Sequence, residues 1–348
     1  MKDVLISVII PVYNCEQYLD RCFQSLVAQT LAHIEFIVIN NGSTDNSAHI
    51  IKKYAENDNR FLYFEQEKGL QQARNRGLQE AHGQYIGFVD ADDYVEPNMF
   101  ELLYHSASKN HSDVVICDYS HSFKRTPDQP NILQLAEEKV CETRYLPRDR
   151  LFLRYFCRYP TIWNKIYRRE IIKQNSICFE SNYGEDLFFN IRFLEHLEVL
   201  SLVPYSLYHY FQSDNSVTRK INTNNQTFLQ NIHHFISTIP AQETSLLPYY
   251  EFSSVIVCFL FSSYVAGENI QFFYRQFRLF KQWPLFSSYA QKLCSNQLAA
   301  MLEENAISHR FYMIQKIAFF LYRYHLDWPA AFFLWGISKV IYVKTRKL

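Results

Sequence analysis

The sequence predicts an α/β fold in which a mostly parallel sheet is covered by helices and followed by an α-helical C-terminal region. Three observations support this prediction. Apolar, β-branched runs alternate with segments of helical periodicity over the first 120 residues. Polar residues directly follow several of the apolar runs, and beyond Lys220 only helical patterns rich in Phe and Tyr remain. A βαβ order of this kind favours parallel strands that are buried on both faces.

The individual elements follow from the same periodicity. Strands are expected where short apolar runs are closed by polar or turn residues, at residues 5–12, 34–39, 61–64, 85–89 and 113–117. Helices are expected where apolar residues recur every three or four positions, at residues 16–30, from about 44, at 70–81 and from about 97. We therefore predict a catalytic or binding domain over residues 1–218 and a helical, aromatic-rich region over 219–348.

Composition excludes several classes of protein. The chain has 348 residues, 48% of them hydrophobic, so it is long enough to bury a core. Lys plus Arg equals Asp plus Glu at 35 each, so no overall positive field favours nucleic acid as a partner. The eight cysteines form no C-x-x-C pair and are expected to be free thiols. The N-terminus lacks the pattern of an export signal. These features predict a cytoplasmic protein.

Polar residues at the ends of the predicted strands indicate where a ligand site lies. They are Tyr13-Asn14, Asn40-Asn41 and the acidic group Asp90-Ala91-Asp92-Asp93. Ligands of open parallel sheets bind at the carboxyl ends of the strands, where the strand order reverses. We therefore expect these segments to line one site.

Asp90 and Asp92 are candidate ligands of a divalent metal. Carboxylates this close together repel one another unless a cation shares them, and Mg²⁺ and Mn²⁺ prefer oxygen ligands. The alternative is a turn with a cap for the helix near Pro97, which accounts for Asp93 better than for Asp90.

Two further features have both a chemical and a structural interpretation. Glu185 and Asp186 stand at a predicted helix start, where acids are also favoured by capping and by the helix dipole. Arg74 follows the third strand on a predicted helix and could hold a phosphate or a base edge, or face solvent. The chain has no G-x-G-x-x-G and no P-loop motif, which disfavours a dinucleotide-binding fold and a P-loop fold.

Taken in order, six segments resemble the family 2 glycosyltransferases. They are residues 7–14 (SVIIPVYN), 40–45 (NNGSTD), 69–78 (GLQQARNRGL), 83–93 (GQYIGFVDADD), 163–165 (WNK) and 184–186 (GED). Each segment is weak evidence alone, but six in this order and spacing are a strong signal. The resemblance implies a Rossmann-like glycosyltransferase type A fold and a transfer that inverts the anomeric centre.

The resemblance also implies roles for individual residues. The donor would be a nucleotide-diphospho-sugar, most simply a UDP-sugar, and the cofactor Mn²⁺ or Mg²⁺. Asp92 would hold the metal and Asp90 the sugar or the metal, while Asp186, beside Glu185, would deprotonate the acceptor hydroxyl. The remaining donor-site residues would be Pro11, Val12, Tyr13 with its ring against the base, Asn41 at the base edge, Arg74, Ala91 and Lys165.

The sequence departs from the family pattern at three places. Asn40-Asn41 replaces the usual pair of aspartates, although an amide can also donate and accept at a base edge. The family often has an arginine near Phe211 or Ser213, but this chain has none there, so Lys165, Arg219 or Lys220 would have to contact the diphosphate. Glu67 stands where relatives often have Asn. His209 has two interpretations that both stay open, a further metal ligand or a packed histidine.

The C-terminal end suggests a relation to membranes. Residues 309–348 contain seven Lys or Arg and one acid, with aromatic and apolar residues between them. Such a segment suits the surface of an anionic membrane, but it also suits a helical subdomain packed on the catalytic domain. The expected acceptor is a growing surface glycan or a lipid-linked oligosaccharide, so peripheral membrane association stays open.

The sequence thus predicts a metal-dependent, inverting glycosyltransferase. A nucleotidyltransferase acting on sugar phosphates is one alternative, although residues 11–14 lack its glycine-rich, basic phosphate loop. A non-catalytic nucleotide-binding scaffold is a second alternative, because Asn40-Asn41 and the missing arginine both depart from the active pattern.

Overall fold

The computed structural model describes residues 4–121, 137–144, 155–156, 161–179 and 185–211, with eight isolated positions between 270 and 334. The chain divides into two compact units. The first is Met1–Pro147 with Tyr159–Asp214, and the second is Arg148–Arg158 with Asn215–Leu348. Almost all described residues belong to the first unit. The domain boundary expected at 218 stays a prediction.

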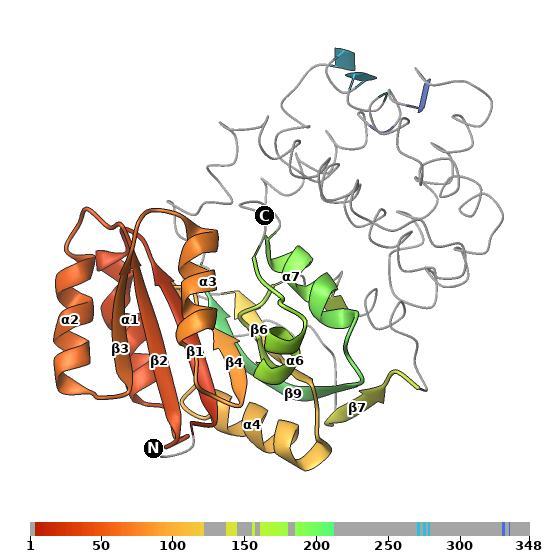
Figure 1. The fold of residues 1–348 in the computed structure, drawn as a ribbon, viewed down its shortest axis with the longest axis horizontal. Helices are drawn as coiled ribbons and strands as arrows, with labels where there is room; N and C mark the ends of the chain where they lie inside the picture. Colours follow the sequence, from red (N-terminus) through yellow and green to blue (C-terminus); the bar gives the residue numbers. More distant parts are fainter. Residues whose placement is uncertain are drawn as a thin grey trace. The chain divides into compact units, whose positions relative to one another are not determined.

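The front of the first unit is an alternation of strands and helices, as the periodicity predicts (Figure 1). Four parallel strands lie side by side in the order β3-β2-β1-β4. Strands β1 and β2 are buried along their whole length, which is why they are apolar without alternation. The elements are β1 (Ile6–Val12), α1 (Glu16–Val27), β2 (Ile34–Asn41), α2 (Ser47–Asn57), β3 (Phe61–Gln66), α3 (Leu70–Glu80) and β4 (Tyr85–Phe88).

The sheet continues past β4 with strands that the sequence analysis only partly predicts. Its order is β3-β2-β1-β4-β8-β6-β9-β5, with β7 paired to β9. Strand β8 is antiparallel to both β4 and β6, whereas β9 is parallel to β6. These elements are β5 (Tyr94–Val95), α4 (Met99–Asn110), β6 (Val114–His121), β7 (Lys139–Glu142), β8 (Lys165–Arg168), α6 (Arg169–Gln174), α7 (Glu185–Leu194) and β9 (Val199–Tyr210). The predicted α/β class is confirmed; four adjacent parallel strands form the front half of the sheet, and β6 and β9 form a further parallel pair.

The register of the parallel strands brings the predicted polar segments to one edge. Val12 lies beside Asn40 in the β1–β2 pair, and Ile9 lies beside Phe88 in the β1–β4 pair. Helix α3, in front of the sheet in Figure 1, packs on β1 and β2. Gly77 on this helix allows the close approach, because an added Cβ would lie 2.4 Å from Cγ2 of Ile9.

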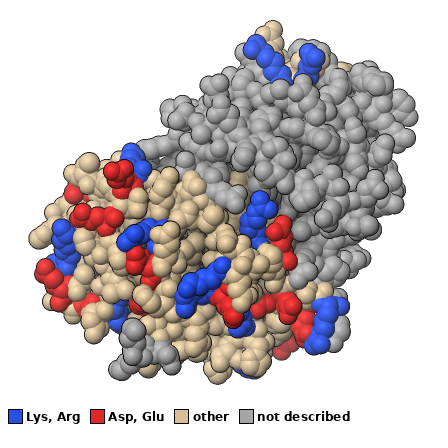
Figure 2. All heavy atoms as spheres, viewed as in Figure 1, with Lys and Arg blue, Asp and Glu red and all other residues tan. Residues whose placement is uncertain are grey.

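The predictions for the C-terminal part fall almost wholly outside the described residues. This applies to the helical, aromatic-rich region and to the basic segment 309–348. Within the described parts of the chain, no helix is both long enough and apolar enough to cross a membrane. Positive and negative side chains are interspersed over the described part of the face in Figure 2. The five cysteines that are described, at 15, 22, 117, 141 and 178, carry free thiols.

Candidate active site

Arg74 joins three acidic residues that are far apart in the sequence. It lies on α3, and its side chain is only 4% exposed. Its Nη1 donates to Oε1 of Glu185 at 2.8 Å and to Oδ1 of Asp186 at 2.9 Å. Its Nη2 donates to Oδ1 of Asp90 at 3.3 Å. One guanidinium therefore connects the start of α7 with the loop that follows β4.

The electrostatics of this cluster follow from one buried cation among three carboxylates. Burial by itself lowers the pKa of Arg74, but Asp186, Glu185 and Asp90 outweigh it and raise the pKa further. Burial also raises the pKa of Asp186 to about 7, with Glu185 and Asp90 adding to the rise and Arg74 opposing it. The carboxyl of Asp186 is 22% exposed. It can therefore reach solvent and exchange a proton near neutral pH.

The loop after β4 is held by the end of β9 and by the residue that follows β9. The hydroxyl of Tyr208 donates to Oδ2 of Asp93 at 2.6 Å and accepts from the backbone N–H of Asp90 at 3.1 Å. The backbone N–H of Phe211 donates to Oδ1 of Asp93 at 2.6 Å. Asp93 is fully buried, and this burial raises its pKa well above the ordinary value, helped by Asp90 and Asp92. The alternative in which Asp93 caps the next helix is wrong, because that helix begins at Met99 with Asn98 as its N-cap.

Asp90 and Asp92 fit the chemistry of a divalent cation that is shared with a substrate. Both side chains are partly exposed, in contrast to Asp93. Arg21 donates to the backbone oxygen of Asp92 at 2.6 Å and so supports the loop from α1. Within the described residues no three His, Cys, Asp or Glu side chains gather as a closed metal cage. Two carboxylates plus substrate phosphates are the usual protein arrangement for Mg²⁺, so the donor set fits such an ion.

The predicted nucleoside side of the site contains one exposed aromatic ring. Tyr13 is 38% exposed at the end of β1, whereas Pro11 and Val12 are buried in the sheet. Lys68 donates to the Tyr13 hydroxyl at 2.8 Å, and its Nζ lies 4.3 Å from the ring centroid. The sequence analysis missed this role of Lys68. Its position just before the matching segment at Gly69 was the available signal.

Asn41 and Asn40 stabilise the turns at this edge of the sheet. Oδ1 of Asn41 accepts the backbone N–H of Gly69 at 2.6 Å, and Oδ1 of Asn40 accepts that of Ser43 at 3.2 Å. Gly42, directly after these two residues, has a φ of +69°, a backbone conformation that residues with side chains rarely adopt. Both side-chain amides are nearly buried, so they help to shape this loop in addition to lying beside it.

Two predicted donor-site residues, Ala91 and Lys165, are buried. Ala91 packs in the core behind the acidic loop. Lys165 is 0% exposed, and its Nζ donates to Oδ1 of Asn164 at 2.7 Å and to the backbone oxygen of Thr161. Burial lowers the pKa of Lys165 to about 7, while Asp186 opposes this shift. The buried position favours an electrostatic influence on Asp186 over direct contact with a diphosphate.

His209 is a packed histidine. Its Nδ1 pairs with Oγ of Ser120 and its Nε2 with Oε1 of Glu96, each at 2.7 Å. Its ring also stacks on Tyr94, with 4.4 Å between centroids. Both ring nitrogens are therefore engaged, which answers the question that the sequence left open. Arg219 and Lys220, which the sequence suggests as contacts of the diphosphate, lie outside the described residues.

A family model matches the front part of this chain. The model of the family described as Glycosyl transferase family 2 matches residues 7–176, which contain the polar ends of β1, β2 and β4 and Arg74. Residues 7–176, slightly less than half of the chain, therefore match a glycosyltransferase family 2 domain. The remaining acidic pair of the cluster, Glu185 and Asp186, lies just beyond the matched range of the family 2 domain.

Curated relatives of the family 2 domain come from several bacteria. The chain is 35% identical over 222 residues to the uncharacterized glycosyltransferase EpsJ of Bacillus subtilis, which covers 62% of this chain and 63% of the relative. It is 33% identical over 236 residues to the cholesterol galactosyltransferase of Borreliella burgdorferi, covering 64% and 65%. The chain thus spans less than two thirds of these relatives.

Solved structures show the same fold. The S. aureus TarS 1–349 structure in complex with UDP-GlcNAc superposes with a TM-score of 0.69, at 18% identity and with 92% of each chain covered. The mannosyltransferase PcManGT from Pyrobaculum calidifontis, in complex with GDP-Man and Mn²⁺, has a TM-score of 0.50 at 14% identity, covering 98% of this chain and 88% of that one.

The first unit therefore brings together residues that are predicted separately from the sequence. Arg74, Asp90, Glu185 and Asp186 form one cluster, which is observed in the structure. The supports from Arg21, Lys68 and Tyr208 were missed, because hydrogen bonds between distant elements leave no pattern in a single sequence.

Proposed function

We propose that this chain is an inverting glycosyltransferase that moves a sugar from a nucleotide-diphospho-sugar, with UDP as the nucleotide, to a hydroxyl of a growing surface glycan or a lipid-linked oligosaccharide. The observation that carries the proposal is the Arg74 cluster. It ties a carboxyl of raised pKa, Asp186, to Asp90 in the acidic loop at the carboxyl ends of the parallel strands. Glycosyl transfer needs a proton acceptor and a positive charge that neutralises the leaving diphosphate; we propose Asp186 for the first and a cation held at the acidic loop for the second.

In the proposed reaction Asp186 accepts the proton of the acceptor hydroxyl. The hydroxyl oxygen then attacks the anomeric carbon from the face opposite the diphosphate, and the bond from that carbon to the diphosphate oxygen breaks. Arg74 orients Asp186 through Nη1 and lies beside Glu185, which we propose as a second carboxylate near the acceptor. A single displacement of this kind inverts the anomeric centre.

We propose Asp92 and Asp90 as the residues that hold Mn²⁺ or Mg²⁺. When bound there, the ion would neutralise the negative charge that develops on the diphosphate. The PcManGT structure, which is a complex with GDP-Man and Mn²⁺, supports a divalent cation in this fold. The TarS structures with UDP-GlcNAc and with UDP support a uridine nucleotide.

On the donor side we propose that the exposed ring of Tyr13 contacts the base. Lys68, which covers this ring in the structure, is placed to move onto the nucleotide when the base arrives. Asn41 is proposed at the base edge, with Pro11 and Val12 forming the wall of the pocket. Peripheral attachment to a membrane through the basic C-terminal segment stays a proposal that suits a lipid-linked acceptor.

The test combines binding with turnover. Calorimetry with UDP and Mn²⁺ measures donor-site binding, and release of UDP from a panel of UDP-sugars measures turnover. We expect Asp92→Asn to lose Mn²⁺-dependent UDP binding. Asp186→Asn should keep binding but lose turnover by roughly 10²- to 10⁴-fold, the usual contribution of a general base.

The matched control is Glu56→Gln, an exposed position on α2 away from the acidic loop, which should leave both readouts unchanged. Full turnover in Asp186→Asn would refute the proposed base. Binding of UDP with no turnover of any UDP-sugar would favour the non-catalytic scaffold.

A further inference from the structure

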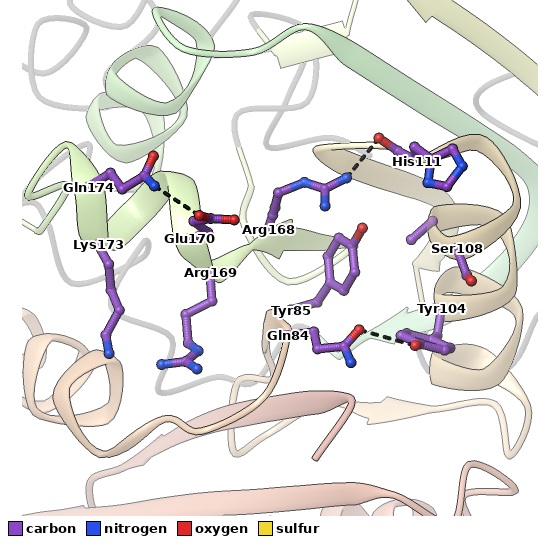
Figure 3. Close-up of a pocket in the computed structure, with 11 residues that line it drawn as sticks. Gln84, Tyr85, Tyr104, Ser108, His111, Arg168, Arg169, Glu170, Lys173 and Gln174 are labelled. Carbon is purple, nitrogen blue, oxygen red and sulfur yellow. Dashed lines mark hydrogen bonds between the residues drawn. The ribbon is translucent and has the colours of Figure 1, made fainter. Parts of the chain in front are cut away.

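A second pocket lies at the end of the sheet opposite to the acidic loop. Gln84 and Tyr85 line it at the start of β4, whereas Asp90 follows the end of the same strand. At about 3.3 Å per residue, the two sites lie up to roughly 20 Å apart along the strand. The pocket has a volume of about 650 Å³ and is formed by α4, the start of β4, the end of β8 and α6. Figure 3 shows its lining.

The lining carries three cations and one carboxylate. The cations are Arg168, Arg169 and Lys173, and the carboxylate is Glu170, which accepts from Gln174 at 2.9 Å. In Figure 3 the side chains of Arg169 and Lys173 extend side by side from α6 in the same direction. An anion entering here therefore meets an excess of positive charge.

The two arginines are held in place by backbone oxygens. Arg168 donates through Nη2 to the carbonyls of His111 and Ser112, at 2.7 and 2.9 Å, and through Nε to Asp113 at 2.9 Å. Arg169 donates through Nε to the carbonyl of Gly83 at 2.5 Å and through Nη1 to that of Ala81 at 3.2 Å. These bonds fix both guanidinium planes before any ligand binds, which reduces the ordering cost of binding.

Several donors in the pocket remain available to a ligand. Among the residues that the structure describes, Nη2 of Arg169 and Nζ of Lys173 have no hydrogen-bond or ion-pair partner. A fixed guanidinium beside a mobile ammonium is a common way to bind phosphate, because it combines directed donors with a point charge.

The wall opposite the cations suits a sugar. Tyr104 donates its hydroxyl to Oε1 of Gln84 at 3.2 Å, which leaves the amide nitrogen of Gln84 as a donor. The rings of Tyr104 and Tyr85 meet edge to face, with 6.1 Å between centroids. An aromatic ring with a polar end offers both an apolar face and hydrogen bonds, which is what a sugar ring needs. The volume also exceeds that of a phosphate alone and falls in the range of small-molecule pockets.

We propose that this pocket binds a sugar phosphate, with the phosphoryl group between Arg169 and Lys173 and the sugar against Tyr104 and Gln84. The ligand is either a free monosaccharide phosphate or a phosphorylated residue of a glycan. The site is independent of the proposed donor site, because it lies at the other end of the strands and uses none of its residues.

The experiment is calorimetric titration of the full chain without nucleotide or metal. The probes are glucose 6-phosphate, methyl glucoside 6-phosphate, inorganic phosphate and glucose. We expect saturable binding of glucose 6-phosphate that weakens at least tenfold in Lys173→Glu and severalfold in Gln84→Ala. Inorganic phosphate should bind more weakly, and glucose more weakly still. Tight binding of methyl glucoside 6-phosphate identifies a glycan-borne ligand. If methyl glucoside 6-phosphate fails to bind while glucose 6-phosphate binds, the ligand is a free sugar phosphate.

The control is Lys53→Glu, which makes the same charge change at another exposed lysine, on α2, and should bind as the wild type does. Lys173 is exposed and has no partner within the described ranges, so its replacement should leave the thermal midpoint unchanged. Equal binding by Lys173→Glu and the wild type overturns the proposal. So does a lack of saturable binding by both sugar phosphates, or inorganic phosphate binding as tightly as they do.

Discussion

Replacing Arg74 by methionine tests the electrostatic account of the candidate active site. Methionine keeps much of the apolar volume but removes the only cation that contacts Asp90, Glu185 and Asp186 at 3.3, 2.8 and 2.9 Å in the described structure. Removing one partner of a buried ion pair typically costs about 3–5 kcal/mol, because the remaining charges stay buried without compensation. The exposed fractions of Asp186 and Asp90 are 22% and 31%, so we expect the lower end, about 3 kcal/mol.

The pH dependence of this loss has a definite sign. A carboxyl whose pKa is higher in the folded state than in the unfolded state makes folding less favourable as pH rises. Burial already raises the pKa of Asp186 to about 7 with Arg74 present, and Arg74 opposes that rise. Without Arg74 the pKa rises further. The difference between variant and wild type should therefore be largest at and above pH 7 and should shrink toward pH 4, where Asp186 is protonated in both folded proteins.

The assay is thermal unfolding at several pH values in the presence of a chelator. A loss of about 3 kcal/mol corresponds to a fall of roughly 6–12 °C in the midpoint for a cooperative unit of this size. The matched control is Arg76→Met on the same helix, which breaks an exposed pair with Glu80 and should cost less than about 1 kcal/mol. The double variant Arg74→Met/Asp186→Asn should recover part of the loss. Equal losses in Arg74→Met and Arg76→Met, or a loss in Arg74→Met that does not depend on pH, would refute the reasoning.

Three further predictions concern single contacts. Tyr13→Ala should weaken UDP binding in calorimetry about tenfold, since base stacking contributes about 1–3 kcal/mol. Tyr13→Phe loses only the hydrogen bond from Lys68 and should stay within about threefold of the wild type. Equal effects of the two substitutions would contradict stacking. Tyr208→Phe should lower the free energy of unfolding in urea by about 1–3 kcal/mol, because the buried carboxyl of Asp93 loses one of its two donors; an unchanged midpoint would show that the bond does not matter. Gly77→Ala should cost about 1–3 kcal/mol in the same assay, because the new Cβ would meet Ile9 at 2.4 Å, and a stabilised variant would show that α3 can shift freely.

Much of the fold and part of the site could be predicted from sequence. The apolar runs of β1 and β2 mark buried parallel strands directly, because both faces of such strands are covered. The acidic loop at residues 90–93 was recognisable for the same reason, since it follows a buried strand. The antiparallel strands beyond β4 were harder to predict, because β5, β7 and β8 contain two to four residues each and are too short to show a period.

The alternation of strands and helices is predictable from the sequence, as are the edge at which polar residues gather and the family 2 pattern of motifs. The candidate acidic residues are predictable too, because residue type and order are local properties. The surroundings of each acid come from the folded structure. Asp93 is buried and accepts a hydrogen bond from Tyr208, whereas Asp186 contacts Arg74 and reaches solvent. The physical reason is that burial and the distance to a cation set the charge state of a carboxyl, and both depend on contacts between residues more than 100 positions apart.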